Sequence, residues 1–268
     1  IMAGDWSSDV CSSDLMDCKH ALQEAEGDFD KAVDIIRKKG LIVASKRADR
    51  EAKEGCVLAA VEGKKGVLVS LNCETDFVAK NENFINFTKQ ILKTALENMP
   101  ADLNSLLALK LDGRSIADQI AEQTGIIGEK LELSFYGKLE AEDAIAYIHP
   151  GNKLATIVGF NKPADMQVKK DVAMQVAAMD PISIDKNDVP ESVIAHELEI
   201  GKEKAREEGK PENMLEKIAQ GRLNKFFQES TLMNQAFIKE AKQTVKAYIQ
   251  SNDKDLTVTG FVRYTLND

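Results

Sequence analysis

The chain has 268 residues, of which 43% are hydrophobic, so it can bury cores in two or three domains of ordinary size. Its formal net charge of -9 argues against a general nucleic-acid binder, because neutralising phosphates requires a basic surface. No apolar run approaches the roughly 20 residues that cross a bilayer, and no secretory signal pattern opens the chain. We therefore expect a cytoplasmic protein that acts on another protein, with no membrane contact and no direct nucleic-acid contact.

The residue types that carry chemistry do not gather into a recognisable site. Cys11, Cys18, Cys56 and Cys73 form no Cys-x-x-Cys pair and no Cys/His spacing typical of zinc. The three histidines are dispersed, and the sequence contains neither a nucleophile elbow nor a phosphate-binding loop. The sequence thus predicts no metal, no cofactor and no catalytic constellation.

The first 15 residues differ from everything that follows. They form a polar Ser/Asp tract with no helical apolar repeat. Residues 5–15 resemble the translation of a sequencing-adapter oligonucleotide. We interpret residues 1–15 as an artefactual or disordered segment, with a divergent natural N-terminus as the alternative.

Helical periodicity begins after this tract. Apolar residues recur at helical spacing over residues 17–26 and 28–39, separated by a Gly-Asp pair suited to a break and an N-cap. Gly40 stands where a left-handed residue ends a helix. These patterns predict two amphipathic helices. The highly charged residues 46–54 lack a wide apolar face and predict a solvated helical linker.

The rest of the chain contains an internal repeat. Each copy has two β-rich runs around a Gly-containing turn, then a segment with helical periodicity, then a third β-rich run. The two copies place these elements at residues 54–72, 83–99 and 130–139, and at residues 142–161, 166–179 and 256–266. The pattern predicts two α+β subdomains, each a small antiparallel sheet backed by helices.

The second copy carries a helical insertion before its last strand. Pro190 precedes a helical run over residues 191–208, and Gly209 stops it. Pro211 then occupies a first-turn position of a second run. The pattern predicts a helical hairpin over residues 190–232, which either projects from the subdomain or packs as two ordinary helices.

One short motif combines residues suited to recognition. A strand over residues 66–71 runs into a polar turn that contains Thr75, Asp76, Phe77 and Val78. A carboxylate beside an aromatic ring, flanked by polar residues, suits insertion into another protein. The alternative for Phe77 is a ring buried in the core of this chain.

With its neighbours, this Thr-Asp-Phe-Val motif resembles bacterial elongation factor Ts, and the resemblance covers residues 16–268. The other segments that stand in that family's order are Met16-Asp17-Cys18-Lys19, Glu26-Gly27-Asp28-Phe29, Arg37-Lys38-Lys39-Gly40, Lys46-Arg47-Ala48, Tyr147-Ile148-His149, Lys170-Asp171-Val172-Ala173-Met174-Gln175 and Gly221-Arg222-Leu223-Asn224-Lys225-Phe226-Phe227.

The resemblance implies a division into domains. Residues 16–45 would be a ubiquitin-associated-like (UBA-like) helical module, truncated because its first helix is missing. Residues 46–140, including the linker helix, would form the N-terminal α+β subdomain. Residues 141–268 would form the C-terminal α+β subdomain, with residues 190–232 as a coiled-coil insertion.

The resemblance also implies a function without bond chemistry. The chain would bind elongation factor Tu, both GDP-bound and nucleotide-free, and promote exchange of GDP for GTP. Phe77 would be the wedge and Asp76 the polar competitor that dislocate Mg²⁺ from Tu, with Thr75 and Val78 fixing the turn. Met16 and His149 would be further contacts with Tu. The alternative is a UBA-like module that binds ubiquitin or a peptide and has no exchange activity.

Overall fold

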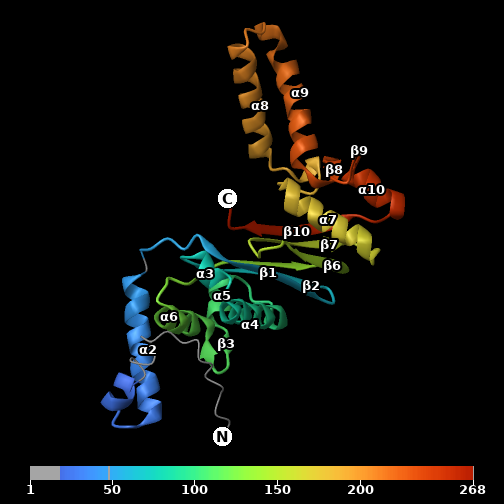
Figure 1. Cartoon of the computed structure of the whole chain (residues 1–268). Coiled ribbons are helices and arrows are strands. Elements are labelled where there is room, and N and C mark those ends of the chain that lie inside the picture. Colours follow the sequence, from blue (N-terminus) through green and yellow to red (C-terminus); the bar gives the residue numbers. More distant parts are fainter. Residues whose placement is uncertain (1–18, 48, 268) are drawn as a thin grey trace. The chain divides into compact units, whose positions relative to one another are not determined.

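The computed structural model describes residues 19–47 and 49–267 (Figure 1). The predictions for residues 1–15 and for Met16 fall outside this range. The chain divides into two compact units. The first comprises the chain up to Cys56 with Ser70–Thr94 and Pro100–Phe135, and the second comprises Val57–Val69, Ala95–Met99 and Tyr136–Asp268.

The described part of the first unit begins with two helical segments, as predicted. Helical backbone covers residues 19–24 and is broken at Glu26 and Gly27, whose φ angles are +53° and +86°. The Asp28 carboxylate then accepts a hydrogen bond from the Lys31 amide at 3.1 Å, which caps the helix α2 (Phe29–Lys46).

The predicted end of this helix at Gly40 is wrong, because α2 continues to Lys46. Gly40 is buried in the helix interior and lies against the backbone of Gly125. The residue is thus suited to a close approach between helices and does not adopt a left-handed conformation.

The predicted helical linker is also wrong over its described part. Arg47, Asp49 and Arg50 form a turn and bend, and the strand β1 (Glu54–Glu62) begins after three residues without regular structure. Arg47 and Arg50 each bind the Glu74 carboxylate, at 3.0 and 2.9 Å. The sequence alone suggests that these two arginines are solvated on a helix, but in the structure both pair with Glu74.

The first three-stranded sheet has the order β1-β2-β5, where β2 is Lys65–Cys73 and β5 is Glu132–Glu140. The helix α4 (Glu82–Asn98) buries Phe84, Ile91 and Ala95, the helical stripe expected from the sequence. The strands and α4 lie within two residues of their predicted positions, and β5 begins two residues later than predicted.

Between α4 and β5 the chain forms elements that the periodicity does not predict. They are α5 (Leu103–Ala108), β3 (Lys110–Leu111), β4 (Arg114–Ser115) and α6 (Ile116–Ile127). Asp102 caps α5 and Ser115 caps α6 through their side-chain oxygens. Gly128 ends α6 in the left-handed conformation, with φ +77°.

The second sheet repeats the arrangement of the first. Its order is β10-β7-β6, with β6 (Asp143–Ile148) and β10 (Val258–Thr265) both antiparallel to β7 (Leu154–Phe160). In both sheets the third strand pairs with the second strand of the hairpin. This common order confirms that the chain is α+β and agrees with the internal repeat expected from the sequence.

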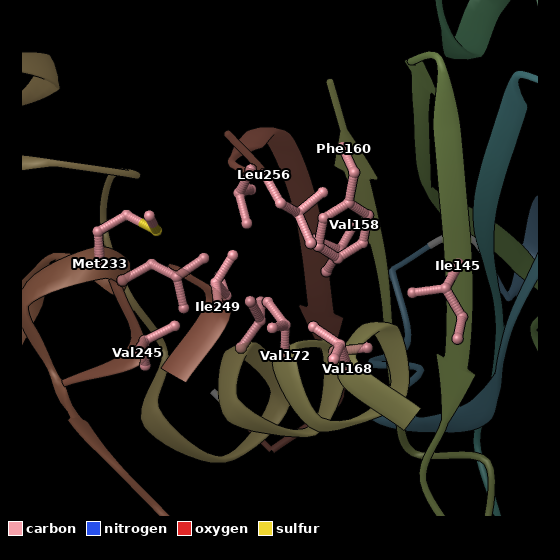
Figure 2. Close-up of a cluster of buried hydrophobic side chains, with 13 residues drawn as sticks. Ile145, Val158, Phe160, Val168, Val172, Met233, Val245, Ile249 and Leu256 are labelled. Carbon is pink, nitrogen blue, oxygen red and sulfur yellow. The ribbon is translucent and has the colours of Figure 1, made fainter. Parts of the chain in front are cut away.

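The core of the second unit lies between its sheet and two helices, α7 (Met166–Met179) and α10 (Val245–Asn252) (Figure 2). Phe160 and Val158 from β7 meet Val172 from α7 and Ile249 from α10, all fully buried. Burying side chains of this size stabilises the fold by roughly 1.5–3 kcal/mol each.

Two long helices lie where the sequence predicts a helical hairpin. They are α8 (Glu191–Glu207) and α9 (Glu212–Ser230), joined through Gly209 at φ +71° and Pro211, which precedes the first turn of α9. A Cβ atom on Gly201 would lie 3.1 Å from the Ala219 Cα, so the two helices pack closely. Two short 3-10 turns, Lys186–Asp188 and Leu232–Asn234, and the strands β8 (Ala236–Phe237) and β9 (Glu240–Thr244) complete the unit.

Asp171 on α7 gives the second unit a pH-dependent contribution to stability. Its nearly buried carboxylate accepts hydrogen bonds from Lys239, Tyr248 and Gln167 at 2.7, 2.8 and 2.7 Å. Burial alone raises the pKa of Asp171, but these donors outweigh it and hold the pKa below its usual value of 3.8. The stabilisation is therefore present above the unfolded pKa and is lost as pH falls through the folded pKa.

We expect urea unfolding to show this dependence. Between about pH 5 and about pH 3, the free energy of unfolding should fall more for the natural chain than for Asp171→Asn, which cannot titrate at this position. An equal pH dependence in the two proteins would show that the three donors do not favour the ionised carboxylate.

Candidate functional site

The Thr-Asp-Phe-Val motif lies on a single helical turn that follows directly from the first sheet. The strand β2 ends at Cys73, and the helix α3 (Asp76–Ala79) begins after Thr75, whose backbone is extended at φ -123° and ψ 155°. Ala79 is buried and anchors the end of α3. The expected polar turn is thus a short helix between β2 and α4.

Phe77 points into solvent from this turn. It is 84% exposed, whereas Phe84 on α4 is 3% exposed. The alternative that Phe77 is a core ring is therefore wrong. An exposed aromatic side chain held on ordered backbone is typical of surfaces that recognise another molecule.

Asp76 and Val78 flank this ring differently. The Asp76 carboxylate accepts a hydrogen bond from Lys80 Nζ at 2.7 Å, one helical turn later, and both side chains are largely exposed. This hydrogen bond and the charge of Asp76 raise the pKa of Lys80. Exposed pairs of this kind contribute little to stability, so a partner can replace Lys80 at low cost. Val78 is half-buried.

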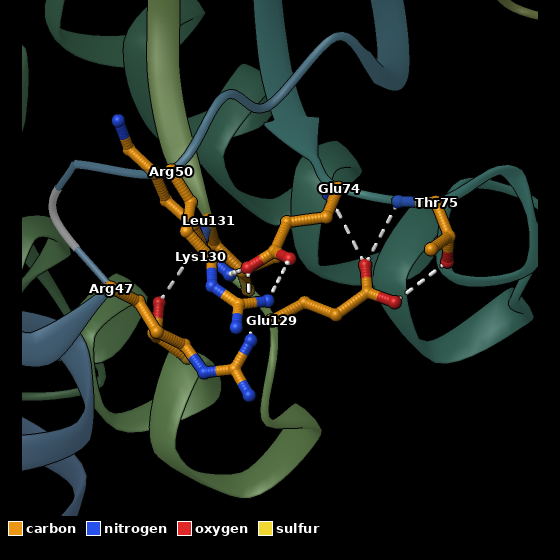
Figure 3. A network of polar contacts seen from close by, with 8 residues as sticks. Arg47, Arg50, Glu74, Thr75, Glu129, Lys130 and Leu131 are labelled. Carbon is orange, nitrogen blue, oxygen red and sulfur yellow. Dashed lines mark hydrogen bonds and ion pairs between the residues drawn. The ribbon is translucent and has the colours of Figure 1, made fainter.

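A second carboxylate holds the entrance to α3 (Figure 3). Glu129, in the connection between α6 and β5, accepts hydrogen bonds from the backbone amides of Glu74 and Thr75 at 3.2 and 3.0 Å. It also accepts the Thr75 hydroxyl at 2.7 Å. Thr75 therefore does not cap α3 with its own side chain.

Glu74 in turn accepts a hydrogen bond from the segment that carries Glu129. Its carboxylate accepts the Lys130 backbone amide at 2.7 Å, together with the guanidinium groups of Arg47 and Arg50 (Figure 3). Burial alone raises the pKa of Glu74, but the Lys130 amide and the two arginines outweigh it and lower the pKa. We call the reciprocal pair Glu74 and Glu129 the glutamate clasp.

Sequence reasoning missed the clasp and its arginines. Glu129 is separated from Thr75 by 54 positions, and Glu74 from Arg47 by 27. No short-range spacing connects them. The only local signal near Glu129 is the preceding Gly128, whose left-handed cap turns the chain after α6.

His149 lies in the second unit, at the start of the turn between β6 and β7. It is exposed, and its Nδ1 lies 3.0 Å from the Tyr147 hydroxyl. The turn closes through hydrogen bonds from the His149 amide to the Leu154 carbonyl and from the Asn152 amide to the His149 carbonyl. Met16, the other expected contact, lies outside the described residues.

The described residues include potential metal ligands and two free thiols. Within residues 19–47 and 49–267, no group of three His, Cys, Asp or Glu side chains is arranged to hold a metal ion. Over the same residues no helix is long and apolar enough to cross a membrane. Cys56 and Cys73 are buried free thiols, and burial raises their pKa values to about 11 and about 12. Such thiols are poor nucleophiles at neutral pH.

Comparison with known proteins places the chain in a family. Residues 74–268, which include the clasp and the exposed ring, match the family model described as Elongation factor TS. The elongation factor Ts of Porphyromonas gingivalis is 52% identical over 254 residues, which cover 94% of this chain and 93% of that protein. Elongation factor Ts of Christiangramia forsetii is 48% identical over 256 residues, covering 94% and 93%, and that of Chloroherpeton thalassium is 44% identical over 269 residues, covering 95% and 93%. The chain therefore belongs to the elongation factor Ts family of translation elongation factors.

Proposed function

We propose that this chain binds elongation factor Tu in its GDP-bound form and accelerates release of GDP, so that GTP can replace it. The observation that carries the proposal is Phe77, which is 84% exposed on a short helix fixed at both ends. The proposal gives the chain no bond-making or bond-breaking role, and places its action in the cytoplasm.

The mechanism follows from how a GTPase holds its nucleotide. Mg²⁺ bridges phosphate oxygens and requires nearly ideal octahedral geometry, at about 2.1 Å to each ligand. A small displacement therefore weakens nucleotide binding strongly. In our proposal Phe77 enters the G domain of Tu as a wedge, and Asp76 exchanges Lys80 for a polar group near the Mg²⁺ site. Thr75 and Val78 keep the turn in place.

The remaining parts of the chain would extend this contact. We propose that His149 on the second unit contacts Tu, with Met16 as a further contact of the N-terminal module. We also propose that residues 16–45 form a UBA-like module, that residues 46–140 and 141–268 are the two α+β subdomains, and that α8 and α9 act as a coiled-coil arm. In this proposal the chain itself holds no metal or cofactor and contacts no nucleic acid or membrane.

Stopped-flow release of fluorescent GDP from Tu tests the proposal directly. We expect GDP release to accelerate with the concentration of this chain until it saturates. A release rate that does not change at any concentration would rule out exchange activity and favour a passive binding module, which ubiquitin binding would then identify.

Thermodynamic coupling provides an independent prediction. If the chain weakens GDP binding to Tu by some factor, GDP must weaken the binding of the chain to Tu by the same factor. Calorimetry should therefore show that the affinity for Tu falls as GDP and Mg²⁺ are added. An affinity that is independent of nucleotide would contradict the exchange mechanism.

A further inference from the structure

We propose that Glu129 is a positioning residue that sets the orientation of Phe77 by holding the two residues before α3. This inference rests on the exchange function proposed above. It assigns a role to a side chain outside the Thr-Asp-Phe-Val motif, on a segment that follows α6.

The helix α3 cannot fix the ring by itself. It has four residues, and an isolated helical turn is unstable because nucleation costs more than one turn of hydrogen bonds returns. Its N-cap residue, Thr75, makes no side-chain cap hydrogen bond. The direction in which Phe77 points must therefore come from contacts with the rest of the first unit.

Glu129 supplies such contacts at the start of α3. One carboxylate accepts three hydrogen bonds, from the amides of Glu74 and Thr75 and from the Thr75 hydroxyl. Hydrogen bonds to an ionised acceptor are stronger than those between neutral groups. At the other end, the burial of Ala79 fixes the last residue of the turn. Phe77 lies between these two anchors.

Glu129 is itself well placed to act as an anchor. The Lys130 amide next to it donates to Glu74 at 2.7 Å, and the Leu131 amide donates to the Thr124 hydroxyl at 3.3 Å. The two segments of the clasp therefore hold each other. Arg47 and Arg50 bring positive charge to Glu74, which offsets the repulsion expected between two neighbouring carboxylates.

The consequence for exchange is preorganisation. A ring that already points in the inserting direction loses less conformational entropy when it enters the partner. Without Glu129, Phe77 would remain present and exposed but would sample more orientations. The loss should therefore appear in the rate of GDP release at saturation as well as in binding.

The test compares four variants with the natural chain, each as the whole 268-residue chain. Glu129→Gln removes the charge: the carboxamide oxygen can still accept from the two amides and its NH2 can face the Thr75 hydroxyl, but the hydrogen bonds to the amides are no longer charge-assisted. Thr75→Val removes the hydroxyl, and Thr75→Ser restores it. Glu132→Gln makes the same change of charge as Glu129→Gln at an exposed neighbouring position, where the carboxylate pairs with Lys130 Nζ at 3.0 Å.

Hydrogen exchange of the free protein reports on the clasp without Tu. We expect the amides of Glu74 and Thr75 to exchange roughly tenfold faster in Glu129→Gln, the effect of replacing charge-assisted hydrogen bonds by weaker neutral ones. Thr75→Val should show a smaller increase, Thr75→Ser should recover the protection, and Glu132→Gln should match the natural chain. Unchanged protection in Glu129→Gln would overturn the proposal.

GDP release from Tu at saturating concentrations of each variant then separates positioning from simple stability. A variant that is only less folded reaches the natural maximal rate when added in excess. Glu129→Gln should instead have a maximal rate lowered by roughly tenfold. Faster amide exchange with an unchanged maximal rate would overturn the positioning role.

Phe77→Ala, measured alongside, tests the proposed function itself. If this variant keeps full exchange activity, the exchange mechanism is wrong regardless of the result for Glu129→Gln.

Discussion

Phe77→Ala should lower the rate of GDP release from Tu at least about thirtyfold, the effect of removing an interface side chain worth roughly 2 kcal/mol. The free energy of unfolding should change by about 0.5 kcal/mol or less, as for other surface substitutions. The physical reason is that the ring is 84% exposed and contributes little to the core. Stopped-flow fluorescence and urea unfolding measure the two quantities.

Phe84→Ala is the control, because it should lower stability strongly and affect exchange only through the folded fraction. Phe84 is 3% exposed on α4, so its truncation should lower the free energy of unfolding by about 3–5 kcal/mol. Any loss of exchange should then follow the folded fraction. If Phe77→Ala showed this pattern, the ring would serve the fold of this chain and not the partner.

Asp76→Ala separates the carboxylate from the ring. We expect slower GDP release and a change in the free energy of unfolding of about 0.5 kcal/mol or less, because Asp76 and its ion-pair partner Lys80, at 2.7 Å, are both exposed. Lys80→Ala is the matched control: it breaks the same ion pair but leaves the carboxylate in place. Exchange should therefore persist in Lys80→Ala. Full activity in both Phe77→Ala and Asp76→Ala would contradict the wedge mechanism even if Tu binding were observed.

Much of the fold could be predicted from local patterns. The alternation around residues 54–72 and 142–161 predicts two hairpins, and both are present. The helix over residues 166–179 has the predicted bounds. Pro190 and Pro211 correctly mark the starts of α8 and α9. These signals depend on side-chain spacing and on turn residues, both of which act over a few positions.

The parts that sequence reasoning missed depend on distant contacts. Gly40 is of the residue type that commonly ends a helix, yet α2 continues through it, and α6 packs against it. The helix α6 is an exception, because Ser115 at its start and Gly128 at its end are local helix signals that sequence reasoning did not use. The exposure of Phe77 follows from polar neighbours in sequence, but the clasp that holds its turn joins Glu74 to Glu129 across the first unit. No local pattern specifies that pairing.

A substitution at the contact between α2 and α6 should also change the stability of the chain strongly. The two helices cross with almost no space between their backbones: a Cβ atom on Gly125 would lie 2.3 Å from the Gly40 Cα. Real Cβ atoms do not approach a backbone carbon so closely. Gly125→Ala must therefore push α2 away from α6.

The same interface contains its own control. A Cβ atom on Gly40 would lie 3.6 Å from its nearest neighbours, which is ordinary van der Waals contact. Both glycines lie inside helices, where alanine is favoured over glycine by about 1 kcal/mol. Gly40→Ala should therefore leave stability unchanged or raise it by up to about 1 kcal/mol.

Gly125→Ala gains the same helical preference but creates the clash. Overpacking of this kind costs about 1–3 kcal/mol, so we expect a net loss of stability despite the gain in helix propensity. Hydrogen exchange should show where the loss falls: amides of α2 should lose protection, while those of β2 and α4 keep it. The contrast is sharp because one methyl group is added in each variant, at positions that face each other. Equal stabilisation by Gly40→Ala and Gly125→Ala would show that α2 does not pack on α6 at this crossing. The position of α2 would then not explain how Arg47 and Arg50, which follow it, reach Glu74.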